Sequence, residues 1–395
     1  MTSVSRERVY AIVDGVFTEL WTVADFIWHH PEIAHTEHQS MRVLAETLER
    51  HGFVVQRGVA GFPTAFRADI HVKEGAPTVA FLAEYDALPE IGHACGHNLI
   101  GTAAVGAGVA LARLAKEAGG NVCVIGCPAE EVPPPVKVAM HERGAFSGVD
   151  LAMYLHGSDR TTAGGRSLAL DTLDMRFRGK ASHAAAGPER GRSALDAAVL
   201  CMHAIELLRE HVPSDMRIHG IITNGGQAPN VVPEFAALRY LVRGPTRAVV
   251  DAVVPRVIRC AQAAALATDT EVEIENVGKY WDKLNVPALN AALLEEAAAA
   301  GALDVREPPE GAASNDVGAV TYAVPTATLN VKLVPDGVSA HSVEFRDAAG
   351  GEPGQKALRF GAKAMAATGW RFLADEAFRE RVRGEHRAAV ARARS

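Results

Sequence analysis

Apolar residues in the first part of the chain follow two different spacings. They recur every three to four positions through residues 6–29 and again at 40–51, which predicts two amphipathic helices. Two further helices are expected at 100–116 and 136–143. Short apolar runs, too brief for helices, predict buried strands at 53–55, 64–70, 78–83, 122–125 and 151–155. Because these strands alternate with helices, we expect a mostly parallel sheet with helices on both faces.

The pattern changes near residue 167. Alternating apolar and polar residues predict half-exposed strands at 167–178, 217–223, 231–242 and 271–277, with helices at 194–211 and 247–267. Strand, helix, two strands, helix, strand is the order of a ferredoxin-like unit. The pattern of helices and short buried strands from the first part of the chain then resumes, with helices at 288–300, 353–374 and 376–394 and a strand at 326–331. We therefore predict an α/β domain, residues 1–170 and 283–395, that is interrupted by an inserted ferredoxin-like α+β domain, residues 171–282.

Composition and charge narrow the classes of protein that this chain can represent. Its 395 residues are too many for one ordinary core, in agreement with two domains. The formal net charge of −7 argues against a nucleic-acid partner. We find no secretory signal and no stretch close to the ~18 apolar residues that span a bilayer, so we expect no membrane partner. The 5 cysteines, an odd number in a large chain, favour a reducing compartment, and we expect the cytoplasm.

The densest concentration of reactive side chains lies between the predicted strand 78–83 and the next helix. It reads AEYDALP at 83–89 and HACGHN at 93–98, at the carboxyl end of a strand, where open α/β sheets bind ligands. Cys95 and His97 can reach one cation because Gly96 lets the backbone bend between them. Thiolate and imidazole suit zinc, with nickel, cobalt or manganese as alternatives. Asp86 would then hold a ligating imidazole in the right tautomer.

Two more predicted strands end in residues of the same kind. Glu130 and Glu131 follow strand 122–125, and adjacent acids at a strand end repel unless a cation or a proton relieves them. One carboxylate can bind metal while its neighbour moves protons. His156 follows strand 151–155 in the same way. Each feature alone has a structural explanation, an acidic first helical turn or a core histidine. Three strand ends with metal-type side chains together favour a metal site.

These motifs resemble those of the aminoacylase, carboxypeptidase and dipeptidase family of co-catalytic metallopeptidases. The branch that they match is the amidohydrolases of aminobenzoyl-glutamate hydrolase and β-alanyl-lysine dipeptidase type. The resemblance runs from about residue 31 to residue 367 and is strongest at 83–100, 179–186, 220–232 and 341–345. It implies a metal-dependent hydrolase that cleaves the amide C–N bond of an N-acyl or N-aroyl amino acid or a dipeptide-like small molecule.

Carried over position by position, the resemblance implies a set of metal ligands, which are Cys95, His97, Glu131, His156 and His341. They would hold one or two divalent ions, with zinc or manganese favoured and nickel or cobalt as alternatives. Glu130 would be the general base that takes a proton from water and returns it to the leaving nitrogen.

The resemblance also assigns the inserted domain a role as a lid that mediates homodimerisation. His183 looks like the histidine that reaches into the partner subunit's site and stabilises the oxyanion. Asn230 matches a substrate-contacting asparagine, and Arg243 is a further candidate for contacting substrate.

Two departures from the family pattern bear on the substrate. Prolines at 133–135 stand where glycines are usual after the paired glutamates, which stiffens that loop and removes backbone donors. Arg166 stands where small polar residues are usual and could bind a substrate carboxylate, although a solvated arginine is the simpler reading. Both changes keep an alternative open, an aminohydrolase that releases ammonia from an aromatic amino acid such as a substituted aminobenzoate.

Two readings from other classes compete with a metal-dependent enzyme. In one, Cys95 is a thiol nucleophile with His97 as its base, but this leaves Glu130, Glu131 and His156 without roles. In the other, the chain is a non-catalytic subunit that uses the fold to bind a partner. Loss of a ligand or of the base would indicate that, and neither is lost.

Overall fold

The computed structural model describes residues 3–308 and 314–394, which form two compact units. The first unit holds the chain up to Arg166 and nearly all of the chain from Lys283 onward. The second holds Ser167–Asp282 and a short segment that ends at Gly318. The predicted fold class, an α/β unit interrupted by an α+β unit, is confirmed.

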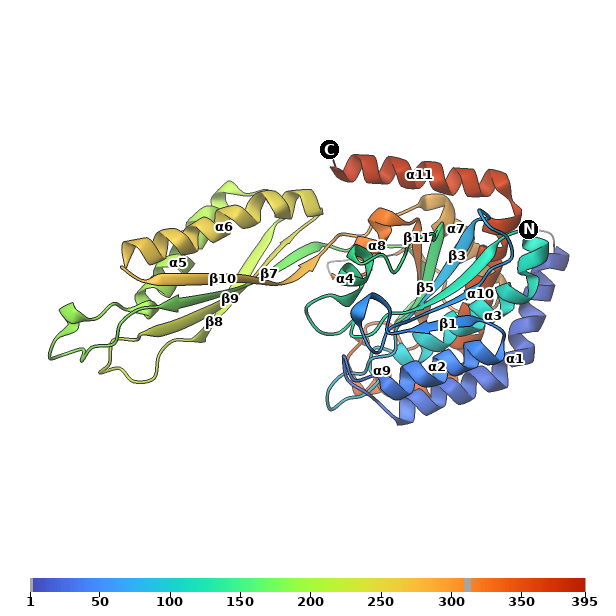
Figure 1. The fold of residues 1–395 in the computed structure, drawn as a ribbon, viewed down its shortest axis with the longest axis horizontal. Coiled ribbons are helices and arrows are strands. Elements are labelled where there is room, and N and C mark those ends of the chain that lie inside the picture. Colours follow the sequence, from blue (N-terminus) through green and yellow to red (C-terminus); the bar gives the residue numbers. More distant parts are fainter. Residues whose placement is uncertain (1–2, 309–313, 395) are drawn as a thin grey trace. The chain divides into compact units, whose positions relative to one another are not determined.

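A seven-stranded sheet in the order β1-β2-β4-β3-β5-β11-β6 forms the centre of the first unit (Figure 1). Its strands are β1 Val54–Arg57, β2 Phe66–Ile70, β3 Thr78–Ala83, β4 Asn121–Gly126, β5 Leu151–Ser158, β6 Thr162–Ala163 and β11 Thr326–Lys332. The four central strands, from β4 to β11, are parallel, as predicted. The strands at both edges are antiparallel, which the sequence pattern did not indicate.

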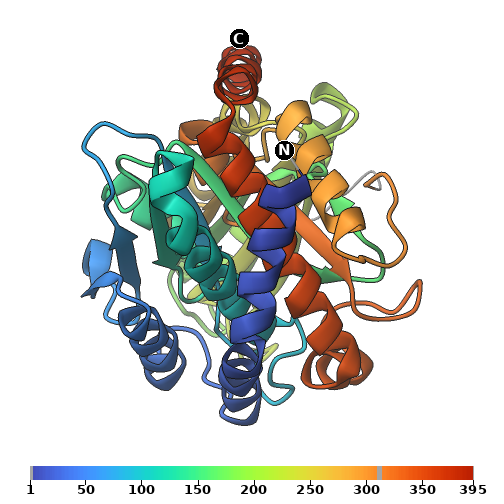
Figure 2. The same cartoon turned by 90° about the vertical axis from the view of Figure 1, so that its right-hand side faces the viewer.

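Helices surround this sheet. They are α1 Ser3–His29, α2 His38–Arg50, α3 His97–Ala118, α4 Val136–Glu142, α7 Pro287–Ala299, α8 Gly318–Ala323, α9 Val343–Gly350, α10 Glu352–Ala374 and α11 Glu376–Arg394. Helices α3 and α10 pack against the central strands, and α1 lies beside both (Figure 2). Glycines let α3 approach closely, because a Cβ on Gly101 would stand 2.8 Å from the carbonyl oxygen of Glu84.

One expectation from the sequence is wrong for α3. By length and composition alone, this 22-residue helix is apolar enough to cross a membrane, whereas no such segment was expected. Glycine and alanine separate the larger apolar side chains of α3. The sequence therefore shows no continuous run of large apolar residues at this position. In the structure 89% of its most apolar stretch is buried inside the protein. Helix α3 is therefore a core helix of the first unit.

The second unit is a four-stranded antiparallel sheet in the order β10-β7-β9-β8. Its elements are β7 Ala169–Arg178, α5 Ala194–Leu208, β8 Arg217–Asn224, β9 Phe235–Gly244, α6 Arg247–Ala267 and β10 Glu271–Tyr280. Helices α5 and α6 lie side by side on one face of this sheet, where Phe177, Tyr240 and Val257 belong to a shared apolar core (Figure 1). This is the predicted ferredoxin-like order.

Candidate metal centre

Three adjacent parallel strands of the first unit end at the same edge of the sheet. Strand β3 lies between β4 and β5, so the residues that follow their carboxyl ends converge. Glu84 directly follows β3, the pair Glu130 and Glu131 follows β4, and His156 lies near the end of β5. The sheet topology therefore brings together residues that are up to 72 positions apart, counted from Glu84 to His156 (156 − 84).

The backbone turns sharply between the strand and α3 at Gly96. This residue has a left-handed φ of 79°, and it is the N-cap of α3, which begins at His97. A residue with a Cβ adopts this conformation at a cost, so glycine suits the position. The turn aims Cys95 at the end of β5, where its Sγ lies 3.5 Å from Nε2 of His156.

The structure brings all five predicted metal ligands together in two overlapping groups. Cys95, His97 and His156 form one group, and Cys95, Glu131 and His341 form the other, with donor atoms within 4.8 Å of one another in each. Nε2 of His341 lies 3.3 Å from Oε1 of Glu131, and Nε2 of His97 lies 3.7 Å from the same oxygen. Donors around one tetrahedral zinc stand about 3.3 to 3.8 Å apart, given Zn–N and Zn–S lengths of about 2.0 to 2.3 Å.

Hydrogen bonds fix the tautomers of two of these histidines. Nδ1 of His97 lies 3.0 Å from Oδ1 of Asp86, and Nδ1 of His156 lies 2.8 Å from the carbonyl oxygen of Gly157. Both partners are acceptors, so in the neutral ring each Nδ1 carries the proton and each Nε2 presents a lone pair to the cluster. Asp86 therefore stands where a carboxylate that orients a ligating imidazole belongs.

Burial and close charges shift the pKa values in the cluster. Burial raises the pKa of the Cys95 thiol to about 12, although His97 acts against this. Burial disfavours the charged form of His97, but the Asp86 carboxylate and Cys95 raise the pKa of His97 well above its usual value. Burial opposes ionisation of Asp86 as well, and the charge of His97 still lowers the pKa of Asp86 to about 2. Without a cation the cluster therefore retains protons that a cation would displace.

The segment that carries Glu130 and Glu131 is held in an uncommon backbone conformation. Ala129 has a φ of 54°, in the left-handed region, and so does His341 with a φ of 66°. Such residues cost about 1 to 3 kcal/mol each and concentrate at functional sites. The backbone N–H of Glu131 donates to Oδ2 of Asp86 at 3.0 Å. Asp86 thus holds both a histidine and the acidic segment.

Sequence reasoning missed a buried ion pair behind the cluster. Nζ of Lys137 lies 2.8 Å from Oε1 of Glu84, and both side chains are nearly inaccessible to solvent. The other oxygen of Glu84 lies 3.7 Å from Nε2 of His97. Glu84 was part of the recognised motif but had no assigned role, and Lys137 lies in a predicted helix without a motif. The one available indication was an acid directly after a fully apolar strand.

The two lid residues with the strongest predicted roles lie beside each other in the second unit. An isolated antiparallel bridge joins His183 to Val231, and the N–H of Ala184 donates to the carbonyl oxygen of Asn230 at 3.0 Å. Nδ1 of His183 accepts the N–H groups of Ala185 and Ala186 at 3.2 and 3.1 Å. In the neutral ring the proton therefore sits on Nε2, which makes Nε2–H an available donor.

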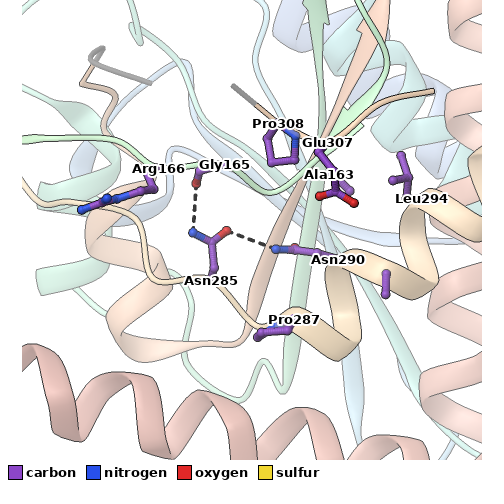
Figure 3. Close-up of a pocket in the computed structure, with 10 residues that line it drawn as sticks. Ala163, Gly165, Arg166, Asn285, Pro287, Asn290, Leu294, Glu307 and Pro308 are labelled. Atoms are coloured by element: carbon purple, nitrogen blue, oxygen red, sulfur yellow. Dashed lines mark hydrogen bonds between the residues drawn. The ribbon is translucent and has the colours of Figure 1, made fainter. Parts of the chain in front are cut away.

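The two candidate arginines have different surroundings. Arg243, on β9, is half-buried, and its Nε has no hydrogen-bond partner among the described residues. Arg166 borders a pocket of about 400 Å³ in the first unit, and none of the predicted metal ligands lines that pocket (Figure 3). Its side chain extends away from Asn285 and Asn290, which meet at the centre of the view. The structure thus does not bring Arg166 to the cluster, and its role stays a prediction.

Comparison with known proteins agrees with this architecture. The Peptidase dimerisation domain family matches residues 169–269. The Xaa-Arg dipeptidase of Mus musculus is 34% identical over 98% of this chain and 93% of its own length. One of the subunits of the p-aminobenzoyl-glutamate hydrolase of Escherichia coli is 39% identical over 68% of this chain and 60% of its own length. A dinuclear metal binding peptidase of the M20 family from Bacillus subtilis has the same fold, with a TM-score of 0.64 and 20% identity over 89% of this chain and 98% of that one.

These relatives define the class of the protein as a hydrolase that acts on carbon–nitrogen bonds. The chain belongs to the M20 peptidase family. The resemblance noted in the sequence is confirmed, and so is the expectation of an amide-cleaving enzyme. The alternative of an aminohydrolase that releases ammonia from an aromatic amine is not favoured.

Proposed function

We propose that this enzyme hydrolyses the amide bond of a small N-acyl or N-aroyl amino acid or dipeptide with one or two divalent metal ions. The observation that carries the proposal is the convergence of donor atoms whose nearest charged neighbours are other predicted ligands. Nε2 of His97 and Oε1 of Glu131 are both buried and have no hydrogen-bond partner among the described residues. Buried polar atoms ordinarily form hydrogen bonds, so two such atoms 3.7 Å apart support a cation site.

The donor set fits a divalent cation well. A thiol, imidazoles and a carboxylate are ligands of zinc, and the same nitrogen and oxygen donors serve manganese. Cys95 belongs to both donor groups, so the five residues would supply donors for one or two ions. The thiol would lose its proton on binding, since thiolates are the ligating form. The Bacillus subtilis relative is described as dinuclear, in agreement with this arrangement.

When bound, the metal lowers the pKa of water towards ~7 and polarises the amide carbonyl. Glu130 lies in a group with His97 and Glu131, with one oxygen within 4.8 Å of their donor atoms. From there its carboxylate accepts a proton from the attacking water and delivers it to the departing nitrogen. Asp86 keeps the backbone of Glu131 and the ring of His97 fixed while this proton moves.

The second unit supplies polar groups for the substrate in this proposal. His183 would reach into the site of the partner subunit and donate its Nε2–H to the developing oxyanion, because Nδ1 is already engaged by two backbone N–H groups. Asn230 contacts the substrate next to it. Arg243 and Arg166 remain candidates for a substrate carboxylate.

A homodimer through the second unit completes the proposal. Residues 169–269 match a dimerisation domain, and β8 is an edge strand of its sheet. Ile221 and Ile222 on β8 are 63% and 43% exposed, so apolar side chains lie on the surface at this edge. An unpaired strand edge with apolar neighbours is suited to pairing with a second copy. We further propose the cytoplasm as the location, since 5 cysteines, an odd number scattered through a large chain, favour a reducing compartment.

The test is metal content followed by activity on a panel of N-acyl amino acids, aminobenzoyl-glutamate, dipeptides and aminobenzoates, before and after chelation. We expect release of a new carboxylate and amine, loss of this activity on chelation, and its return with zinc or manganese. Ammonia release from an aromatic amine with every amide intact would contradict the proposal, as would full amide hydrolysis by metal-free protein.

A further inference from the structure

Glu37 is a buried carboxyl group that belongs to none of the predicted roles. It is 0% exposed and occupies the N-cap position of α2. Residues at this position usually bond their own helix, but Glu37 makes no such side-chain bond. Glu32 caps α2 in its place, because its carboxylate accepts the backbone N–H groups of Gln39 at 3.0 Å and Ser40 at 2.8 Å. The side chain of Glu37 is therefore available for another partner.

That partner is the segment that carries the acidic pair. Oε1 of Glu37 accepts the N–H of Ala129 at 2.9 Å, across 92 positions of sequence, and the N–H of His35 at 2.9 Å. Ala129 and His35 are both non-glycine residues with left-handed φ, 54° and 67°. The Cβ atom of each residue disfavours this backbone conformation, and the hydrogen bond from each N–H to Glu37 stabilises it. Glu37 thus holds the turn immediately before Glu130.

Asp86 holds the same segment from its other end. Its Oδ2 accepts the N–H of Glu131, so the stretch from Ala129 to Glu131 is bonded to one buried carboxyl group at each end. Only Asp86 also touches a predicted ligand through its side chain. Loss of Asp86 would disturb His97 and the acidic segment together, whereas loss of Glu37 would release the acidic segment and the turn at His35 and leave the bond between Asp86 and His97 in place.

We propose that Glu37 is a positioning residue that fixes the backbone of Ala129 and thereby aims the Glu130 carboxylate. This inference rests on the proposed function, in which Glu130 moves the proton. The Oε1 of Glu37 carries the effect by accepting the N–H of Ala129, and Glu37 belongs to none of the donor groups of the cluster. A misplacement of about 1 Å at a catalytic group can lower a rate by about 10²-fold.

Two variants distinguish the hydrogen-bond acceptor of Glu37 from the packing of its side chain. Glu37→Gln keeps an oxygen for both N–H groups, and Glu37→Met keeps the length of the side chain but removes the acceptor. Glu32→Ala is the matched control, because it removes bonds to the start of α2 and leaves Ala129 untouched. If Glu37→Met does not fold, Glu37→Asp replaces it, since one methylene less withdraws the carboxylate from Ala129.

The measurements are kcat and KM, metal content, and amide hydrogen exchange of the segment 127–131. We expect Glu37→Met to lower kcat by about 10²-fold with KM and metal content little changed, and to speed exchange of the Ala129 amide. Glu37→Gln should remain within a few-fold of the natural enzyme. Glu32→Ala should lower the melting temperature and leave kcat unchanged.

Several outcomes would overturn the inference. They are an unchanged kcat in a folded, metal-loaded Glu37→Met enzyme, an equal loss in the Gln and Met variants, and a loss confined to KM or metal content. Failure of the proposed function is recognised separately, because the natural enzyme itself would then show no metal-dependent amide hydrolysis.

Discussion

The predicted ligands His97 and Glu131 and the predicted lid residues His183 and Asn230 are held in place in opposite ways. In the first unit His97 is wholly buried and Glu131 nearly so, and the buried carboxylate of Asp86 bonds to both. In the second unit His183 and Asn230 are exposed, and the segments that carry them are tied by backbone hydrogen bonds. Buried, braced donors are suited to a cation that needs fixed geometry. Exposed groups on loops are suited to a substrate that must enter and leave.

Substitution of His183 tests the role of the exposed lid residues and has the largest expected effect. His183→Ala removes the Nε2–H donor, and we expect kcat to fall about 10²- to 10³-fold, as for loss of one oxyanion donor. Metal content should not change, since the residue lies outside the donor groups. His203→Ala, at an exposed position of α5, is the control and should keep full activity. Equal kcat values for the two variants would remove His183 from the mechanism.

A substitution on the edge strand β8 tests whether two copies of the second unit form a dimer. Ile221→Asp places a charge on the exposed face of β8, and we expect dimer association to weaken by about tenfold to 10²-fold. Sedimentation at several protein concentrations measures this. Leu266→Asp, at an 82% exposed position at the end of α6, should leave association unchanged. Unchanged association in Ile221→Asp would place the interface elsewhere.

Substitution of Asp86 tests whether its hydrogen bonds fix the geometry of the buried ligands. Asp86→Asn weakens the acceptor for Nδ1 of His97, and we expect metal affinity to fall about tenfold to 10²-fold. Competition with a chromophoric chelator measures the affinity. Asp69→Asn, which breaks an ion pair with Arg67 away from the donors, is the control. A metal affinity equal to that of the control would show that the ring of His97 is held without Asp86.

The same carboxylate predicts a smaller effect on acid stability of the metal-free protein. The pKa of Asp86 falls from 3.8 to about 2 on folding, so between about pH 4 and pH 2 the unfolded chain binds more protons. This contribution is present above pH 4 and is lost as pH falls to 2, an amount of about 2 kcal/mol. Urea unfolding should therefore show the stability difference between natural protein and Asp86→Asn shrinking by that amount. A difference independent of pH would contradict the assigned cause.

The elements and the metal-type residues could largely be predicted from local sequence. Strand β3 and helix α6 have the predicted bounds, because continuous apolar runs and helical spacing are properties of neighbouring residues. Strand ends bearing Cys95, Glu131 and His156 could be predicted to meet, since parallel strands share a carboxyl edge. His341 was found through the family resemblance alone, because it lies in a loop without periodicity.

Features that depend on distant partners could not be predicted. The two-residue strand β6 and the short helix α9 are too brief for a periodic pattern. Glu37 bonds to Ala129 across 92 positions of sequence, and Lys137 forms an ion pair with the distant Glu84. Neither role can be seen in the residues that neighbour Glu37 or Lys137 in the sequence. Arg166 could be a solvated arginine or a substrate contact by its sequence, and the structure places it beside a pocket that none of the predicted ligands lines.

The central claim is that a metal-type cluster and Glu130 together cleave an amide bond. The most direct test is Glu130→Gln, which removes the base while leaving the five predicted ligands unchanged. We expect the variant to retain the metal content of the natural enzyme and to lose about 10²- to 10⁴-fold in amide hydrolysis. A metal-loaded Glu130→Gln enzyme that hydrolyses amides at the natural rate would contradict the account.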